Sequence, residues 1–379
     1  MSLLLNEEQQ FLKDTAKEFL QKNAPISHFR NLRDSKDETG YSKEVWKQMA
    51  ELGWAGILIS EDYGGSNFGM MGLGGILEET GRTLVPSPLF STALVGASFI
   101  ELAGNENQKK EFLPKIVSGD LTTAFALEEG PRHSPTNIST LAKKEGKSFK
   151  INGQKTFVLD GHSADTLIVA ARTDGEINDS VGITLFIIDK DTKGLTVNRA
   201  HMVDSRNASE IKFKDVEVNE NSILGDLNAG YSVIEEVLDR AQIGLSSEML
   251  GSALEAFDRT LEYLKERKQF GSVIGSFQAL QHRAAIMFTE LELTKSAVVG
   301  ALNAVDENSN DRGRFASLAK FKAGETLHLV SNEAVQMHGG IGVTDEFDIG
   351  FFLKRSRVAE QIFGSSDYHI DKYAKLSEY

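Results

Sequence analysis

The chain has 379 residues, of which 40% are apolar and 25% are charged. This balance is typical of a soluble globular protein with large cores, and the length corresponds to two or three domains. The formal net charge of −14 argues against nucleic-acid binding, which needs a basic surface for the phosphates. Because the chain has no cysteine, disulfides, thiolate metal sites and cysteine nucleophiles are excluded.

No segment of the sequence predicts a targeting signal or a membrane span. The opening string MSLLLNEEQQFLKD has three leucines followed almost at once by acidic residues, so it lacks the basic start and the longer apolar core of a signal peptide. No apolar run approaches the ~20 residues that a helix needs to cross a bilayer. The eight histidines show no metal-ligand spacing. We therefore predict a cytoplasmic protein without a bound metal.

Residues 1–120 have the apolar spacing of helices. Apolar residues recur every three or four positions in EQQFLKDTAKEFLQKNA, SKEVWKQMAELGWAGI and ENQKKEFLPKIVSG. Asn6 and Ser42 stand where short polar side chains cap helix N-termini. The glycine-rich string EDYGGSNFGMMGLGG, residues 61–75, predicts a loop leading into the next helix, with its last glycines in a tight turn.

From residue 121 the period changes. Strings such as SFKINGQKTFVL, DTLIVAART and GITLFIID are short and rich in β-branched and aromatic residues, which is typical of strands. Asn152-Gly153 predicts a hairpin turn between two of these runs. Helical spacing returns at residue 229, with breaks at 270–277, 306–312 and 338–348.

These patterns predict an α+β multidomain protein with three domains. The first is an N-terminal helical domain, the second a central antiparallel β-barrel or sandwich domain, and the third a C-terminal four-helix bundle. The predicted ranges are 1–120, 121–228 and 229–379.

Two local patterns suggest a ligand site. The string RKQFG from Arg267 closes a predicted helix and combines a forked cation, an amide and an aromatic ring, which suit a flat ligand that carries phosphates. A helix C-terminus with basic residues and a glycine stop would look the same. On one face of the same helix Glu248 lies between Gly244 and Gly251, which leaves either room for a ligand or a close helix crossing with Glu248 in an ion pair.

The C-terminal third resembles the acyl-CoA dehydrogenase family. LEYLKERKQFGSVIGSFQALQHRAA and EAVQMHGGIGVTDEFDI look like the family's paired signature. ELGWAGILISEDYGG and GNENQKKEFLPKIVSGDLTTAFALEEG resemble its earlier domains, so the likeness covers the whole chain. The tail from FFLKRSRVAEQIFGSS onward looks closest to the small subunits of pimeloyl-CoA-type dehydrogenases.

The resemblance implies FAD as cofactor and gives positions for it. Those that match the family's contacts to the pyrophosphate, the adenine side and the diphosphate are Arg267, Gln269, Phe270, Gln278, Gln336, Gly339 and Gly340. Those that match positions near the flavin are Phe125, Leu127, Ser134, Phe157 and either Ser365 or Ser366. The family's usual Thr-Glu-Pro is Glu128-Glu129-Gly130 here, so a carboxylate replaces a threonine near the flavin.

The catalytic base is the main departure from the family. Members usually carry a glutamate at one of two positions, and neither has an acid here. Ala241 occupies the first position. Gly364 occupies the second when the count runs without gaps from Gln361-Ile362, and Phe363 occupies it when the alignment starts from the glycine. Glu248 lies two turns beyond Ala241 on nearly the same face and is the remaining candidate for the base.

The reaction implied is α,β-dehydrogenation of an acyl-CoA thioester, with electrons passed to an electron-transfer flavoprotein. A backbone N–H at Gly364 can still stabilise the thioester oxygen, because it does not depend on a side chain. The resemblance also implies a homo-oligomer or a heterotetramer with a related dehydrogenase chain. Two alternatives stay open: a non-catalytic or half-site subunit of a heteromeric dehydrogenase, and a flavin oxidase.

Overall fold

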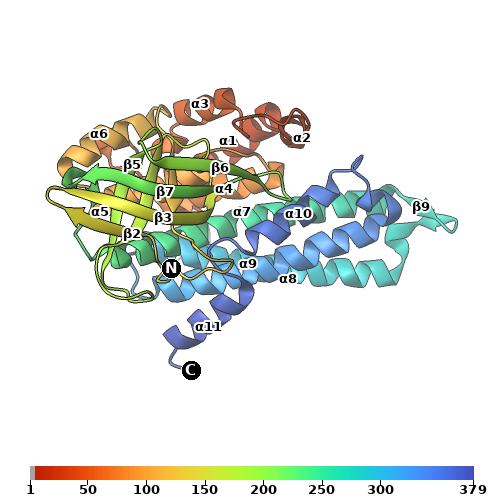
Figure 1. Cartoon of the computed structure of the whole chain (residues 1–379). Coiled ribbons are helices and arrows are strands. Elements are labelled where there is room, and N and C mark those ends of the chain that lie inside the picture. Colours follow the sequence, from red (N-terminus) through yellow and green to blue (C-terminus); the bar gives the residue numbers. More distant parts are fainter. Residues whose placement is uncertain (1–4) are drawn as a thin grey trace. The chain divides into compact units, whose positions relative to one another are not determined.

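The structure is a computed structural model that describes residues 5–379 (Figure 1). Helices precede residue 118, strands occupy 123–224, and helices return from Gly230. This order confirms the predicted α+β fold class. The chain forms two compact units, which are described separately. The helical unit contains the chain up to Asn31, Met70–Val85 and Gln242–Tyr379, and the sheet unit contains Leu32–Gly69 and Pro86–Ala241.

The sheet unit is built on one eight-stranded sheet among the described residues. In chain order its strands are β1 (Thr123–Ala126), β2 (Leu141–Glu145), β3 (Ser148–Leu159), β4 (Thr166–Arg172), β5 (Ile183–Asp189), β6 (Leu195–His201), β7 (Asn207–Asn219) and β8 (Ile223–Leu224). Their spatial order is β6-β7-β3-β2-β4-β5-β8, and β1 pairs with β4. Most pairs are antiparallel, as predicted, but β4 pairs in parallel with β1 and with β2. Phe149 and Phe186 meet in the core with ring centroids 5.3 Å apart.

The predicted hairpin turn at Asn152-Gly153 is wrong. The chain reverses before β3, at Gly146, and both residues lie inside β3, where the pairing with β7 shifts by one residue. A side chain at Gly153 would meet Thr140, 2.4 Å from its Oγ1, and the glycine has φ +155°. The Asn-Gly pair therefore lies opposite a β-bulge in β7, and Gly153 lets the strand pass close to Thr140.

Helices and a short π-helix complete the description of the first 120 residues. They are α1 (Glu7–Asn23), α2 (Ile26–Asp34), α3 (Lys43–Glu51), α4 (Met70–Thr83), the π-helix Leu89–Gly96, α5 (Ala97–Ala103) and α6 (Glu106–Val117). Both predicted caps are present. The Asn6 side chain accepts from the Gln9 backbone N–H at 2.8 Å, and Ser42 Oγ accepts from Val45 at 3.2 Å.

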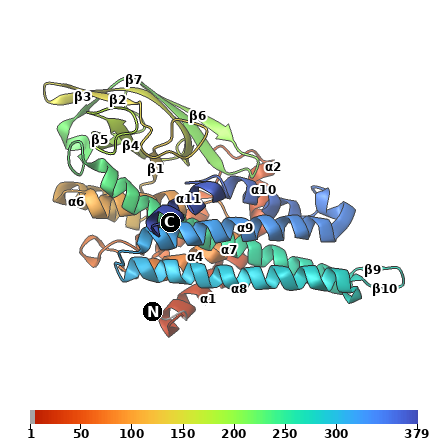
Figure 2. The ribbon, with the colours of Figure 1, turned by 90° about the horizontal axis from the view of Figure 1, so that it is seen from below.

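Long helices make up the C-terminal part of the helical unit. They are α7 (Gly230–Glu266), which starts in the sheet unit, α8 (Gln278–Asp306), α9 (Arg312–His338), α10 (Ile349–Ala359) and α11 (Ser366–Leu376). The predicted breaks between them are confirmed. Figure 2 shows α8 and α9 side by side, with the two-stranded ribbon of β9 (Lys268–Gln269) and β10 (Ser272–Val273) at one end.

The glycines at 72–75 do not form the predicted tight turn but lie within α4. Their place is explained by packing. A Cβ at Gly74 would stand 2.5 Å from a methyl of Leu302 on α8, so only glycine admits that side chain. The loop predicted over 61–75 is correspondingly shorter and ends before Met70.

Candidate active site

The predicted FAD residues around Arg267 and around Gly339 gather at one end of the helical unit. Arg267 follows the end of α7, and Gly339 follows the end of α9. Tyr263, one turn before Arg267, joins these two ends: its ring stacks on His338 at 4.3 Å, and its hydroxyl donates to the His338 carbonyl at 3.3 Å. The structure therefore brings together the two strings that the resemblance matched to the FAD phosphates.

This end of the helical unit has the surface that a phosphate-bearing flat cofactor needs. Its polar side chains and its glycine backbone are exposed: Arg267, Gln269, Gln278, Gln336, Gly339 and Gly340. Phe270 is 92% exposed and has a left-handed φ of +55° at the tip of the β9–β10 ribbon. A Cβ at Gly339 or at Gly340 would meet nothing within 4 Å, so a ligand can approach this backbone closely. These residues fit FAD.

The two predicted serines stand at the start of α11. Ser365 is the N-cap residue, and Ser366 is the first residue of the helix. The Ser366 hydroxyl is buried and has no hydrogen-bond partner among the described residues. A buried hydroxyl without a partner is costly, so it is a group that a bound molecule can satisfy.

The sheet unit holds the other predicted FAD residues. Phe125 in β1 and Leu127 just after it are buried, and the Phe125 ring packs against Phe99 with centroids 4.5 Å apart. Phe157 in β3 is 36% exposed and has φ +51°, and Ser134 is half-buried. The Thr156 backbone N–H donates to the Glu128 carbonyl at 2.8 Å, so the Glu128 loop lies beside Phe157.

The carboxylate that replaces the family's threonine has a partner in this chain. Glu128 Oε1 lies 2.5 Å from His133 Nδ1, and Glu128 Oε2 accepts from the Ser134 backbone N–H at 3.3 Å. The pair fixes the loop that carries Ser134. Glu128 is therefore tied to its own loop, which the sequence alone did not indicate.

Lys155 and Glu129 form a buried ion pair beneath this loop that sequence reasoning missed. Lys155 Nζ is fully buried, 2.7 Å from Glu129 Oε1 and 2.9 Å from the Leu127 carbonyl. Burial alone would raise the pKa of Glu129, but the Lys155 charge and hydrogen bonds from Ser139 and Thr140 lower it to about 2. Burial lowers the pKa of Lys155, and Glu129 opposes that effect. An internal lysine in a β strand was the only sequence signal for this pair.

Glu248, the predicted base, is buried in an ion pair. Its Oε1 lies 3.0 Å from Nε and 2.9 Å from Nη2 of Arg355 on α10. The side chains of Glu248 and Arg355 are 4% and 7% exposed. Of the two interpretations that the sequence left open for this helix face, the geometry agrees with the close helix crossing.

The glycine beside Glu248 supports the same interpretation. A Cβ at Gly251 would lie 1.8 Å from the backbone carbonyl oxygen of Glu78 on α4, and a Cβ at Gly81 would lie 2.0 Å from the Glu248 carbonyl oxygen. The space at Gly251 is thus filled by α4 rather than open to a ligand. The expectation that this glycine gives a substrate room is wrong.

The two other base positions of the family carry no acid, and one of them contacts a buried lysine. Ala241 is buried within α7, and Phe363 and Gly364 form the turn between α10 and α11. Lys320 on α9 donates to the Gly364 carbonyl at 3.1 Å. Sequence reasoning missed this lysine, because nothing in a helical pattern distinguishes a buried lysine from an exposed one.

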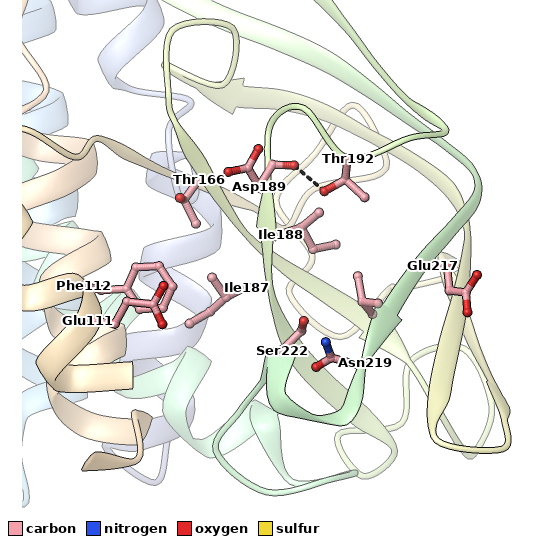
Figure 3. A pocket seen from close by; sticks show the side chains of 11 residues that line it. Glu111, Phe112, Thr166, Ile187, Ile188, Asp189, Thr192, Glu217, Asn219 and Ser222 are labelled. Carbon is pink, nitrogen blue, oxygen red and sulfur yellow. Dashed lines mark hydrogen bonds between the residues drawn. The ribbon is translucent and has the colours of Figure 1, made fainter. Parts of the chain in front are cut away.

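A separate pocket lies in the sheet unit (Figure 3). Its volume is about 310 Å³, and it lies between α6 and the strands β5 and β7. Phe112 and Ile187 form its apolar side, and Glu111, Asp189 and Glu217 add three carboxylates. No predicted site residue lines it, and its acidic edge would repel a phosphate-bearing ligand.

Residues 5–379 contain neither a membrane-spanning helix nor a cluster of metal ligands. No helix there is both long enough and apolar enough to cross a membrane. No group of three or more histidine and carboxylate side chains there is arranged to hold a metal ion.

Comparison with known proteins gives one consistent family. Residues 6–120, 124–216 and 228–376 match the N-terminal, middle and C-terminal domain models of acyl-CoA dehydrogenases. The probable acyl-CoA dehydrogenase YngJ of Bacillus subtilis is 33% identical, over 97% of this chain and 97% of that protein. The caffeyl-CoA reductase-Etf complex subunit CarC of Acetobacterium woodii is 31% identical, over 96% of both chains.

A solved structure agrees. Butyryl-CoA dehydrogenase from Megasphaera elsdenii superposes with a TM-score of 0.91 at 27% identity and covers 100% of both chains. FAD is the cofactor of the family, and the gathered, exposed residues at the Arg267 end fit it. The chain therefore belongs to the acyl-CoA dehydrogenase family of flavoprotein oxidoreductases.

Proposed function

We propose that the protein catalyses the α,β-dehydrogenation of an acyl-CoA thioester to the 2-enoyl-CoA and passes the electrons to an electron-transfer flavoprotein. The observation that carries this proposal is the joining of the Arg267 string and the Gly339 turn through Tyr263 and His338, which leaves both exposed for FAD. The name of CarC, a subunit of a reductase-Etf complex, supports the proposed electron acceptor.

Each group of residues has a part in this proposal. Arg267, Gln269 and Gln278 would bind the phosphates and the adenine side, and the backbone at Gly339 and Gly340 would lie against the diphosphate. Phe125, Leu127, Phe157 and Ser134 would lie near the flavin, and Ser365 or Ser366 would bond to it. When bound, FAD supplies the acceptor for the hydride that leaves the β-carbon.

Within this chain, Glu248 is the predicted residue for removing the α-proton. For that role its carboxylate must be released from Arg355, because a carboxylate paired with a guanidinium is a poor proton acceptor. The ion pair between Glu248 and Arg355 therefore leaves two possibilities for the base. Either Arg355 moves when a substrate binds, or the base comes from another chain.

The ion pair favours a second candidate function, a subunit of a heteromeric acyl-CoA dehydrogenase whose partner chain provides the base. Ala241, Phe363 and Gly364 offer no carboxylate, and Arg355 already holds Glu248. A small subunit of the pimeloyl-CoA type, which the tail led us to expect, would have such a partner chain. Exposed apolar side chains suit an oligomer of either kind: Phe270 is 92% exposed and Val343 is 78% exposed.

Flavin bleaching under single turnover tests both candidates. The FAD-loaded chain is mixed without oxygen with isovaleryl-CoA, butyryl-CoA or octanoyl-CoA, and ferrocenium then serves as the electron acceptor. Bleaching by the chain alone supports the dehydrogenase, and bleaching only with a second dehydrogenase chain supports the heteromer. Rapid reoxidation of the reduced flavin in air would instead identify an oxidase.

The variants Glu248→Gln and Phe363→Glu locate the base. If Glu248 is the base, Glu248→Gln slows bleaching by ~10²–10⁴-fold while FAD and acyl-CoA still bind. Phe363→Glu then tests whether the family's usual position restores activity in the Glu248→Gln background. Gly364→Glu is unsuitable, since Gly364 has φ +112° and a Cβ there would lie 2.5 Å from the Tyr368 ring. Equal bleaching rates in wild type and Glu248→Gln would exclude Glu248.

A further inference from the structure

Lys320 is a buried cation whose hydrogen bonds go to backbone carbonyls. The residue is 2% exposed, and its Nζ lies 3.1 Å from the Glu360 carbonyl and 3.1 Å from the Gly364 carbonyl. Burial lowers its pKa to about 7, with Glu360 opposing this and Arg355 adding to it. Burying a charged side chain costs free energy, so the position of Lys320 calls for a structural or functional explanation.

Both of its acceptors belong to the segment that ends α10 and turns toward α11. The turn is strained at Phe363, which has φ +54°, whereas Gly364 adopts its φ of +112° without a side-chain clash. A residue with a side chain costs about 1–2 kcal/mol in the left-handed region, so such a turn persists only where its surroundings hold it.

Three side chains from three helices hold this turn. Lys320 on α9 bonds to the Gly364 carbonyl. Gln242 Nε2 on α7 donates to the Phe363 carbonyl at 3.1 Å, and His369 Nε2 on α11 lies 3.0 Å from the same oxygen. Because a peptide unit is planar, fixing its carbonyl also fixes the N–H on its other side. The Phe363 carbonyl therefore sets the Gly364 N–H, and the Gly364 carbonyl sets the Ser365 N–H.

One of the N–H groups set in this way is only weakly bonded within the chain. The Gly364 N–H makes only a long contact of 3.4 Å to the Gln361 carbonyl. Lys320 acts through its hydrogen bond to the Gly364 carbonyl, which orients the peptide unit between Gly364 and Ser365. Gln242 and His369 orient the peptide unit between Phe363 and Gly364 through the Phe363 carbonyl.

We infer that Lys320 is a positioning residue that holds the Phe363–Gly364 turn so that its backbone N–H groups bind the thioester oxygen of the acyl-CoA. The inference rests on the proposed function, in which the substrate is an acyl-CoA thioester whose oxygen gains negative charge as the α-proton leaves. Gln242 and His369 share the task. Lys320 itself touches neither substrate nor cofactor.

The test compares Lys320→Met with Lys322→Met in the FAD-loaded protein. Lys322 lies on the same helix and pairs with Glu290, away from the turn, so it is the matched control. Hydrogen–deuterium exchange of peptides covering 360–369 reports the turn directly. We expect exchange there to rise at least ~10-fold in Lys320→Met and to stay unchanged in Lys322→Met, because a local hold is lost.

Kinetics with isovaleryl-CoA or butyryl-CoA then separate positioning from general stability. Since an N–H donor to a developing oxyanion acts mainly in the transition state, kcat should fall ~10²-fold or more while KM changes less than about threefold. FAD affinity should not change. Should Lys320→Met fail to fold, Lys320→Gln, which keeps a donor on a shorter, uncharged side chain, takes its place, and we expect changes in the same direction but smaller.

Unchanged exchange in the turn, or faster exchange with unchanged kcat, overturns the inference. If no acyl-CoA bleaches the wild-type flavin, with or without a second chain, the proposed function fails instead. Faster exchange in that case assigns Lys320 a purely structural role and overturns its part in substrate binding.

Discussion

Glu248 Oε1 accepts a hydrogen bond from Nε of Arg355 at 3.0 Å and forms an ion pair with Nη2 of the same guanidinium at 2.9 Å. The pair joins α7 to α10 inside the helical unit, with both side chains almost fully buried. A buried pair of this kind is costly to break by removing one partner, because the other charge is left without compensation.

The first prediction follows from this pair. Glu248→Gln and Arg355→Met should each lower the free energy of unfolding by ~3–5 kcal/mol, and the double variant should lose much less than the sum. Urea unfolding of the four proteins gives the coupling energy. Additive losses would mean that the two side chains do not stabilise each other, which would contradict the ion pair.

The second prediction concerns FAD. Arg267→Ala removes a charged donor from the proposed phosphate site and should weaken FAD binding by roughly 1.5–3 kcal/mol, or about 10–150-fold. Titration of the apoprotein with FAD, followed by flavin fluorescence, measures this. Lys265→Ala, which removes a cation from the preceding helical turn, should leave the affinity within about threefold. Equal losses in both variants would point to general electrostatic attraction rather than a site.

The third prediction uses the close helix contact at Gly251. Gly251→Ala places a Cβ 1.8 Å from a backbone oxygen, which α4 can relieve only by moving away. We expect a loss of at least ~2 kcal/mol in the free energy of unfolding. Gly300→Ala on α8 is the control, because its Cβ would meet only the Phe315 ring at 3.8 Å. It should be neutral, or stabilising by up to about 1 kcal/mol. Similar losses in both variants would contradict the packing argument.

The fourth prediction is a pH dependence from Lys155 and Glu129. The pKa of Glu129 is lowered to about 2 in the folded chain, so its ionised form contributes stability above its ordinary pKa, near 4.5. That contribution is lost as the pH falls from about 4.5 to about 2. Glu129→Gln should therefore unfold more easily at pH 7 and should show a smaller loss of stability between pH 5 and pH 3 than the wild type. Parallel pH profiles for the two proteins would contradict the assignment.

The order of helices and strands could be predicted from the sequence because apolar residues recur with different periods in the two kinds of element. The caps at Asn6 and Ser42 and the breaks between the C-terminal helices were predictable from local residues alone. The glycines were not. Gly74 and Gly153 look like turn formers in sequence, but the first makes room for Leu302 and the second lets β3 pass close to Thr140, opposite a bulge in β7. Those contacts come from distant parts of the chain.

The candidate site also has a part that could be predicted from local sequence and a part that could not. The strings around Arg267 and Gly339 could be predicted because they are local, and the structure brings them together through Tyr263. The partners of buried charges could not be predicted. Arg355 lies 107 residues from Glu248, and nothing local pairs them. The roles of Lys155 and Lys320 depend equally on burial that no local pattern records.

The division of α7 between the two units has a consequence for synthesis of the chain. The sheet unit has all its residues once Ala241 has been made, whereas the helical unit, which includes α1 and α4, extends to Tyr379. At roughly 5–20 residues per second on the ribosome, α4 waits for α8 for about 10–40 s. During that time the surface of α4 that later receives Leu302 has no partner, so the nascent chain exposes apolar helix faces that chaperones recognise. A single cut cannot release the helical unit whole, because its parts lie on both sides of the sheet unit in the sequence.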